Sequence, residues 1–208
     1  MSINATATSN QDTPITMSQN ELDQWFDQRF EQRLTEKEAS KTPSMSIIAT
    51  KGTMDWAYPP FILASTAAAL GWDVSIFFTF YGLDLLKKDL NLEVSPLGNP
   101  AMPMKLPFGP QWIQNINMKI PNAIMGNMPG FESMATAMMK KTTQNKGVAS
   151  IEELRSLCIE ADVKMLACQM TVDLFGHNQS DFIEEVDDWV GAASFLPTAQ
   201  KSDVSLFI

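Results

Sequence analysis

The chain has 208 residues, of which 45% are hydrophobic and 19% charged, and it carries a net charge of −9. This length allows one domain of ordinary size with an extension. The acidic balance argues against binding to nucleic acid or anionic lipid, because both depend on clustered lysines and arginines. The two cysteines, without a signal-peptide pattern at the start, predict a cytoplasmic protein with free thiols.

Residues 1–43 are predicted to form an N-terminal extension. Residues 1–17 are polar and unpatterned, which is typical of a disordered leader. From Ser18, a capping box with Glu21 opens an amphipathic helix of about 20 residues that ends before Pro43. Its apolar stripe consists of Leu22, Trp25, Phe26, Phe30 and Leu34. We expect this helix to pack on its own domain or on a neighbouring subunit, because its polar face is too acidic for a membrane surface.

Residues 44–208 alternate between strand-like and helix-like segments. Strands are predicted over 45–50, 73–78, 163–168, 189–192 and 204–208. Helices are predicted over 61–70, 82–88, 131–141, 151–160, 170–175, 180–186 and 194–200. Such alternation favours parallel pairing with right-handed crossovers. The predicted fold class is therefore α/β, a flavodoxin-like sandwich with a five-stranded parallel sheet. Residues 56–83 are nearly free of charge, but prolines, Gly71 and Asp73 interrupt them, so no membrane span is predicted.

Residues 95–130 form an insert that is rich in methionine and proline and contains no acidic residue. So many prolines exclude a long helix or a central strand. Two interpretations stay open: a flap over the subunit's own apolar surface, or a contact site for partners or sister subunits. The apolar character of the insert predicts a homo-oligomer. A copper site of methionines is disfavoured, because no histidine lies among them.

Five separated motifs of the chain resemble one known family. They are Lys51-Gly-Thr-Met-Asp-Trp-Ala-Tyr-Pro-Pro60, Phe77-Phe-Thr-Phe-Tyr-Gly82, Val94-Ser-Pro-Leu-Gly-Asn-Pro-Ala-Met-Pro103, Ala167-Cys-Gln-Met-Thr-Val-Asp173 and Val204-Ser-Leu-Phe-Ile208. In this order they resemble the DsrE/DsrF/DsrH-like family, and within it a branch of larger DsrE-like proteins associated with sulfur metabolism. The resemblance spans residues 44–208, including the insert.

The resemblance implies a sulfur relay protein or a sulfurtransferase. Such proteins carry sulfane sulfur on a cysteine, as a persulfide or thiosulfonate, and exchange it with TusA-like or rhodanese-type carriers. The family cysteine corresponds to Cys168. Some relatives have a second cysteine at the end of the first strand, where this chain has Ala49, which puts a two-cysteine mechanism in doubt. The residues predicted to bind substrate are Lys51, Gly52, Thr53 and Met170.

The position of Cys168 points to a reactive thiol without the resemblance. Cys168 ends an apolar strand and precedes a short helix that Gly176 stops, so it lies at the carboxyl edge of a parallel sheet, where ligands collect. The helix N-terminus and Lys51, which ends the first strand, are predicted to favour the thiolate. We also expect the sulfur to be reachable from solvent, and Asp173 to cap the helix or face solvent. The alternative is that Cys168 is a small buried hydrophobic residue.

The other candidate residues are not predicted to take part in catalysis or metal binding. Cys158 shares a helix face with Leu154 and Ala161, which predicts core packing. His177 is the single histidine and is expected to finish the turn after Gly176, so neither a catalytic triad nor a metal site is predicted. Nucleotide-binding glycine patterns are absent from the sequence, and no cofactor is predicted. The competing function is a non-catalytic scaffold, in which the insert or the N-terminal helix holds partners or contacts a membrane peripherally.

Overall fold

The structure is a computed structural model that describes residues 18–95, 109–114 and 130–208. The predicted leader over 1–17 and most of the predicted insert lie outside the described residues. The chain divides into two units, one ending at Lys41 and one from Thr42 to Ile208, and each is described by itself.

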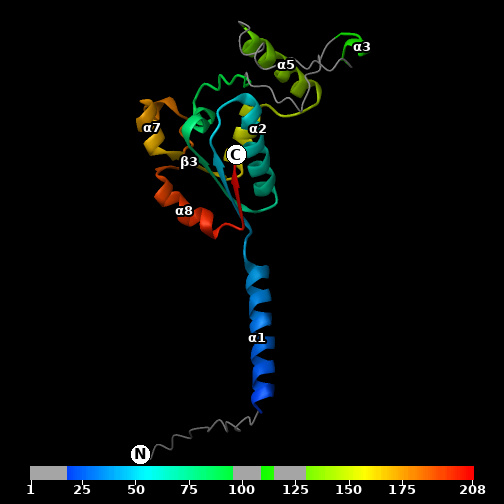
Figure 1. Ribbon diagram of the computed structural model, residues 1–208, viewed down its shortest axis with the longest axis vertical. Helices are drawn as coiled ribbons and strands as arrows, with labels where there is room; N and C mark the ends of the chain where they lie inside the picture. Colours follow the sequence, from blue (N-terminus) through cyan, green and yellow to red (C-terminus); the bar gives the residue numbers. More distant parts are fainter. Residues whose placement is uncertain (1–17, 96–108, 115–129) are drawn as a thin grey trace, which may run out of the picture. The chain divides into compact units, whose positions relative to one another are not determined.

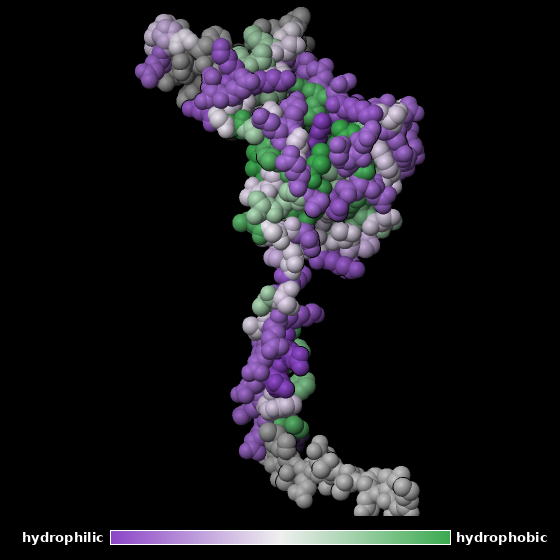
Figure 2. Space-filling view, turned by 180° about the vertical axis from the view of Figure 1, so that it is seen from behind, coloured by the Kyte–Doolittle hydropathy of each residue, from purple (hydrophilic) through white to green (hydrophobic). Residues whose placement is uncertain are grey.

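The first unit contains the predicted amphipathic helix, α1 (Gln19–Ser40). The capping box is confirmed: the Glu21 N–H donates to the Ser18 hydroxyl at 3.4 Å, and the Ser18 N–H donates to the Glu21 carboxylate at 2.8 Å. Figure 2 shows α1 as mainly hydrophilic, with separate apolar side chains along its length. What α1 packs against stays a prediction.

The second unit is built on a sheet of five parallel strands, as predicted (Figure 1). The strands are β1 (Ser44–Ala49), β2 (Asp73–Phe78), β3 (Lys164–Cys168), β4 (Asp188–Val190) and β5 (Val204–Phe207). Their order in the sheet is β4-β3-β2-β1-β5, so successive strands are neighbours until β5, which returns to pair with β1. Because all strands are parallel, their carboxyl ends meet at one edge of the sheet. The arrangement is an α/β sandwich of flavodoxin-like type.

Helices cover both faces of this sheet (Figure 1). The described helices of this unit are α2 (Met54–Ala69), α3 (Gln111–Gln114), α5 (Phe131–Asn145), α6 (Ile151–Glu160), α7 (Gln169–Phe175), α8 (Ala192–Lys201) and two 3₁₀ helices, η1 (Phe80–Leu86) and η2 (Gln179–Asp181). Of these, α3 and α5 lie away from the sheet in Figure 1. The larger core cluster lies between the sheet and the helices α2 and α6. The smaller cluster lies on the opposite face, under α8, and contains Phe77, Cys168 and Phe195.

The start of α2 differs from the prediction. The helix begins at Met54 and runs through Pro59 and Pro60, although the prolines were expected to precede it. Proline inside a helix costs backbone hydrogen bonds. That cost is offset here because Ala57, Phe61 and Ala64 on the same face are completely buried. No helix in the described part of the chain has the length and apolar character that a membrane span requires.

The predicted helix over 180–186 is wrong. Only the short η2 forms, and the chain after it pairs with the segment that follows η1. The Ile183 N–H donates to the Leu86 carbonyl at 2.9 Å, and the Lys88 N–H donates to the Asp181 carbonyl at 3.2 Å. Phe182, between these bonds, is 1% exposed. Burial of its ring and these long-range hydrogen bonds outweigh the local preference for a helix.

Candidate functional site

Cys168 occupies the junction between β3 and α7 at the carboxyl edge of the sheet, as predicted. It is the last residue of β3 and the N-cap residue of α7. Its side chain lies on the α8 face, in the cluster with Phe77 and Phe195, whose rings stack with centroids 4.7 Å apart. Cys168 is only 2% exposed, so the expected opening to solvent is not found. A reaction partner must therefore move the side chains that cover the sulfur.

The surroundings of Cys168 nevertheless favour its thiolate. Burial raises the pKa of the thiol, because it disfavours the charged form. The hydroxyls of Thr171 and Thr79 and the amides of Thr171 and Met170 favour the thiolate more than burial disfavours it, so the pKa lies below its ordinary value. Neither amide reaches the geometry of a full capping bond to the sulfur, so both act on it as nearby dipoles.

The two threonines beside Cys168 were not predicted as site residues. Thr171 is completely buried in the first turn of α7, and its hydroxyl oxygen lies 3.2 Å from that of Thr79. Phe78 pairs with Ala167 across β2 and β3, so Thr79 and Cys168 follow at the same level of the sheet. The sequence contains one signal of this pair, a threonine three residues after a cysteine at a predicted strand–helix junction. The part played by Thr79 depends on strand register.

Exposed apolar side chains lie on η1 and α7, the two helices that follow β2 and β3 at the edge where Cys168 lies. This rim, defined by exposed residues of η1 and α7, consists of Phe80, Tyr81, Met170, Leu174 and Phe175. The Tyr81 and Phe175 rings stack with centroids 5.6 Å apart, and Phe80 meets Phe175 edge to face. Met170, a predicted substrate contact, is 63% exposed, while its N–H acts on Cys168. The rim offers an adaptable apolar surface next to the sulfur.

The predicted substrate loop of Lys51, Gly52 and Thr53 lies against η1, where a Cβ atom at Gly52 would collide with the carbonyl of Tyr81. The Lys51 ammonium sits over the Trp56 ring, 3.1 Å from its centroid, and the groups that act on the pKa of Cys168 are hydroxyls and amides. Lys51 therefore does not supply the predicted cation in this structure.

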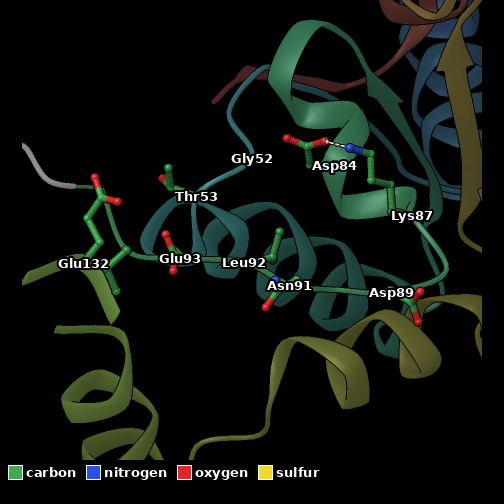
Figure 3. Close-up of a pocket in the computed structure, with 10 residues that line it drawn as sticks. Gly52, Thr53, Asp84, Lys87, Asp89, Asn91, Leu92, Glu93 and Glu132 are labelled. Atoms are coloured by element: carbon green, nitrogen blue, oxygen red, sulfur yellow. Dashed lines mark ion pairs between the residues drawn. The ribbon is translucent and has the colours of Figure 1, made fainter. Parts of the chain in front are cut away.

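Gly52 and Thr53 line a separate hollow of about 530 Å³ (Figure 3). Its lining includes four carboxylates, those of Asp84, Asp89, Glu93 and Glu132. One lysine of the lining, Lys87, is paired with Asp84 at 2.6 Å. Such a lining repels anions, so this hollow is poorly suited to an anionic sulfur donor. Substrate binding by this loop stays a prediction.

The position of the rim depends on Gly82. A Cβ atom at Gly82 would collide with the carbonyl of Ala49, the last residue of β1. Gly82→Ala is expected to lower the free energy of unfolding by about 2 kcal/mol or more, because main chain must move to make room. Gly191→Ala is the control, since a Cβ there meets nothing, and it should lower stability by no more than about 1 kcal/mol, because Gly191 is the N-cap residue of α8 and alanine caps less well. Urea unfolding of both variants measures this difference; equal losses would contradict the close approach.

The structure confirms the sequence predictions that both thiols are free, that Cys158 packs in the core, that Asp173 faces solvent and that His177 finishes a turn. Both cysteines are free, and Cys158 is completely buried in the larger core cluster, where its S–H donates to the Phe61 carbonyl. Burial raises the pKa of Cys158 to about 12. Asp173 is exposed and accepts a hydrogen bond from Gln169 at 2.7 Å. The His177 N–H donates to the Val172 carbonyl at 3.0 Å and so finishes the turn after Gly176.

The fold and the site define a parallel α/β protein with a buried cysteine between β3 and α7. The chain belongs to the DsrE/DsrF/DrsH-like family, whose model matches residues 41–207. The chain is 58% identical over 164 residues to the sulfur carrier protein DsrE2 of Allochromatium vinosum, covering 79% of this chain and 97% of that protein. It is also 27% identical over 168 residues to the uncharacterized protein YrkE of Bacillus subtilis, covering 81% of this chain and 98% of YrkE.

Proposed function

We propose that this protein is a sulfur relay protein that carries sulfane sulfur as a persulfide on Cys168. The observation that carries the proposal is the placement of Cys168 between β3 and α7, where hydroxyl and amide donors lower the pKa of its thiol. The similarity to a protein named as a sulfur carrier supports the same role.

The proposed transfer needs two displacements at sulfur. The Cys168 thiolate attacks the sulfane sulfur of thiosulfate or of a carrier persulfide, and the rest of the donor leaves with its electron pair as sulfite or as a thiolate. A polythionate instead transfers sulfur that still carries its sulfonate, which gives a thiosulfonate on Cys168, and thiosulfate or sulfite leaves. The thiolate of an acceptor then attacks the terminal sulfur of the loaded cysteine, and Cys168 leaves as a thiolate. No external oxidant or reductant is required. Tetrathionate can also leave its thiosulfonate half on the cysteine.

The proposed partners are TusA-like or rhodanese-type sulfur carriers in the cytoplasm. A covered thiol inside an apolar rim supports exchange with another protein, because docking on the rim can displace the covering side chains. We also propose a homo-oligomer, since α2 leaves Ile62, Leu63 and Leu70 exposed. Figure 2 shows apolar side chains reaching the surface of this unit. Peripheral membrane contact through the insert or α1 is a further proposal that rests on the sequence.

Intact-mass measurement tests the proposed function. Treatment with thiosulfate, tetrathionate or polysulfide is expected to add sulfur to the wild type and to Cys158→Ser, but not to Cys168→Ser. Reducing agent should remove the addition. If the wild type gains no sulfur from any of these donors, the relay proposal is wrong.

A scaffold without sulfur chemistry is the second candidate function. The observation that favours it is the 2% exposure of Cys168, which suits a small buried residue. A scaffold would bind its partner equally well as wild type and as Cys168→Ser. Sulfur loading on Cys168 would exclude a purely structural role for this residue.

A further inference from the structure

We infer that Thr171 is a positioning residue, which holds the sulfur of Cys168 with a hydroxyl proton that Thr79 and the main chain of Phe80 direct toward it. This inference rests on the proposed function for its purpose, because it explains how a covered cysteine is kept ready to react. Three observations carry it: a close pair of hydroxyls, an N–H that binds one of them, and an unusual backbone conformation.

The first observation is the number of protons that the hydroxyl pair provides. The Thr79 and Thr171 oxygens lie 3.2 Å apart, so one hydroxyl donates to the other. Each hydroxyl has one proton to donate, and their mutual bond uses one of the two. The other proton is left for a third partner. Cys168 lies beside the pair, because it is the N-cap residue of α7, three positions before Thr171, and is level with Thr79 across β2 and β3. Both hydroxyls also act on the pKa of its thiol. The pair therefore presents one O–H donor to the sulfur whichever way their mutual bond runs.

The second observation is the contact that orients Thr171. The Phe80 N–H donates to the Thr171 hydroxyl oxygen at 3.3 Å and occupies one of its two acceptor positions. When Thr79 donates to the second position, the Thr171 proton is directed to the sulfur. This arrangement satisfies every donor and acceptor position of the Thr171 hydroxyl. Thr171 is also completely buried, so solvent does not compete for its hydroxyl.

The third observation is the conformation of Phe80. Its φ of 49° lies in the left-handed region, which is unfavourable for a residue with a bulky side chain. Burial does not explain this conformation, because Phe80 is 47% exposed. Strained residues of this kind concentrate at functional sites. The same residue donates its N–H to Thr171, so this strained conformation lies at the contact with the hydroxyl pair.

The reaction of the thiol with iodoacetamide as a function of pH tests this role. The measurement uses the full chain carrying Cys158→Ser, so that Cys168 is the single thiol. Thr171→Val removes the hydroxyl at nearly constant volume and is expected to raise the pH of half-reaction by about one unit, or about tenfold less thiolate at neutral pH. Thr171→Ser, which keeps the hydroxyl, should restore the wild-type profile. Thr79→Val should shift the profile less, because Thr171 keeps its own proton and its contact with Phe80.

The shape of the profile separates positioning from a structural role. A looser covering of the sulfur raises the limiting rate at high pH and, because it lessens burial, moves the midpoint down. The loss of a donor to the thiolate moves the midpoint up. An unchanged midpoint in Thr171→Val would overturn the inference. Should Thr171→Val fail to fold, Thr171→Ala provides the same comparison with less steric demand, and an unchanged midpoint there would overturn it equally.

Sulfur loading of the same variants separates this inference from the proposed function. A midpoint that shifts in Thr171→Val, with no sulfur loaded on the wild type, would support the positioning role and refute the relay. If the wild type loads sulfur and the Thr171→Val midpoint equals that of the wild type, the positioning role is refuted and the relay is not.

Discussion

In the folded chain at neutral pH, iodoacetamide is expected to alkylate Cys168 much faster than Cys158. Burial raises the pKa of Cys158 from 9.0 to about 12, which lowers its thiolate fraction about a thousandfold. A thiolate of higher pKa is intrinsically more nucleophilic. On a logarithmic scale, this higher nucleophilicity offsets roughly half of the loss of rate that the smaller thiolate fraction causes. The remaining difference is about thirtyfold before the lowered pKa of Cys168 is counted. Burial of Cys158 in the larger core adds to it.

Peptide mapping by mass spectrometry over a time course measures both rates in one sample. Chain unfolded in urea is the control, because the two rates should converge when the folded surroundings are lost. The pH profile of Cys168 should have its midpoint below the ordinary cysteine value. Equal rates in the folded chain, or a faster Cys158, would contradict the assigned surroundings of the two thiols.

The stability of the fold is expected to depend on pH through Cys158, with a loss at alkaline pH. The folded pKa of about 12 lies above the ordinary value of 9.0, so the folded state holds the proton more tightly than the unfolded state. Below the unfolded pKa this contribution is fully present, and it is lost as pH rises from there through the folded pKa. At about pH 10.5 the loss amounts to about 2 kcal/mol of unfolding free energy.

Cys158→Ala removes this ionisation. The difference in unfolding free energy between the wild type and the variant should therefore decrease by about 2 kcal/mol from about pH 8 to about pH 10.5. Urea unfolding at the two pH values measures the gap. Cys168→Ala is the matched control with the opposite sign. The folded pKa of Cys168 is lowered, so its contribution is present above the unfolded pKa and is lost as pH falls through the folded pKa. A Cys158→Ala gap that is independent of pH would show that burial does not hold the proton on this thiol.

Local sequence patterns predicted most of the helices and strands, because the interactions that form these elements join residues that are close together in the sequence. The capping boxes at Ser18 and Ser150 satisfy helix N–H groups within one turn, and the one at Ser18 forms as predicted. β2 has the predicted bounds. The failures are segments whose structure depends on distant contacts. The prolines of α2 are tolerated because of packing on the sheet, and the chain after η2 is extended because it pairs with the segment after η1.

By itself, the sequence determined that strands and helices alternate and that a cysteine ends the third strand, because hydrophobic periodicity and chain order are local properties. The tertiary structure decided what surrounds that cysteine. Strand register places Thr79 beside Cys168, and the rings of Phe77 and Phe195 pack against it. The Lys51 ammonium lies over the Trp56 ring instead of near the sulfur. The physical reason is that the pKa and the accessibility of a thiol depend on groups within a few ångströms in space, and most of these groups lie far away along the chain.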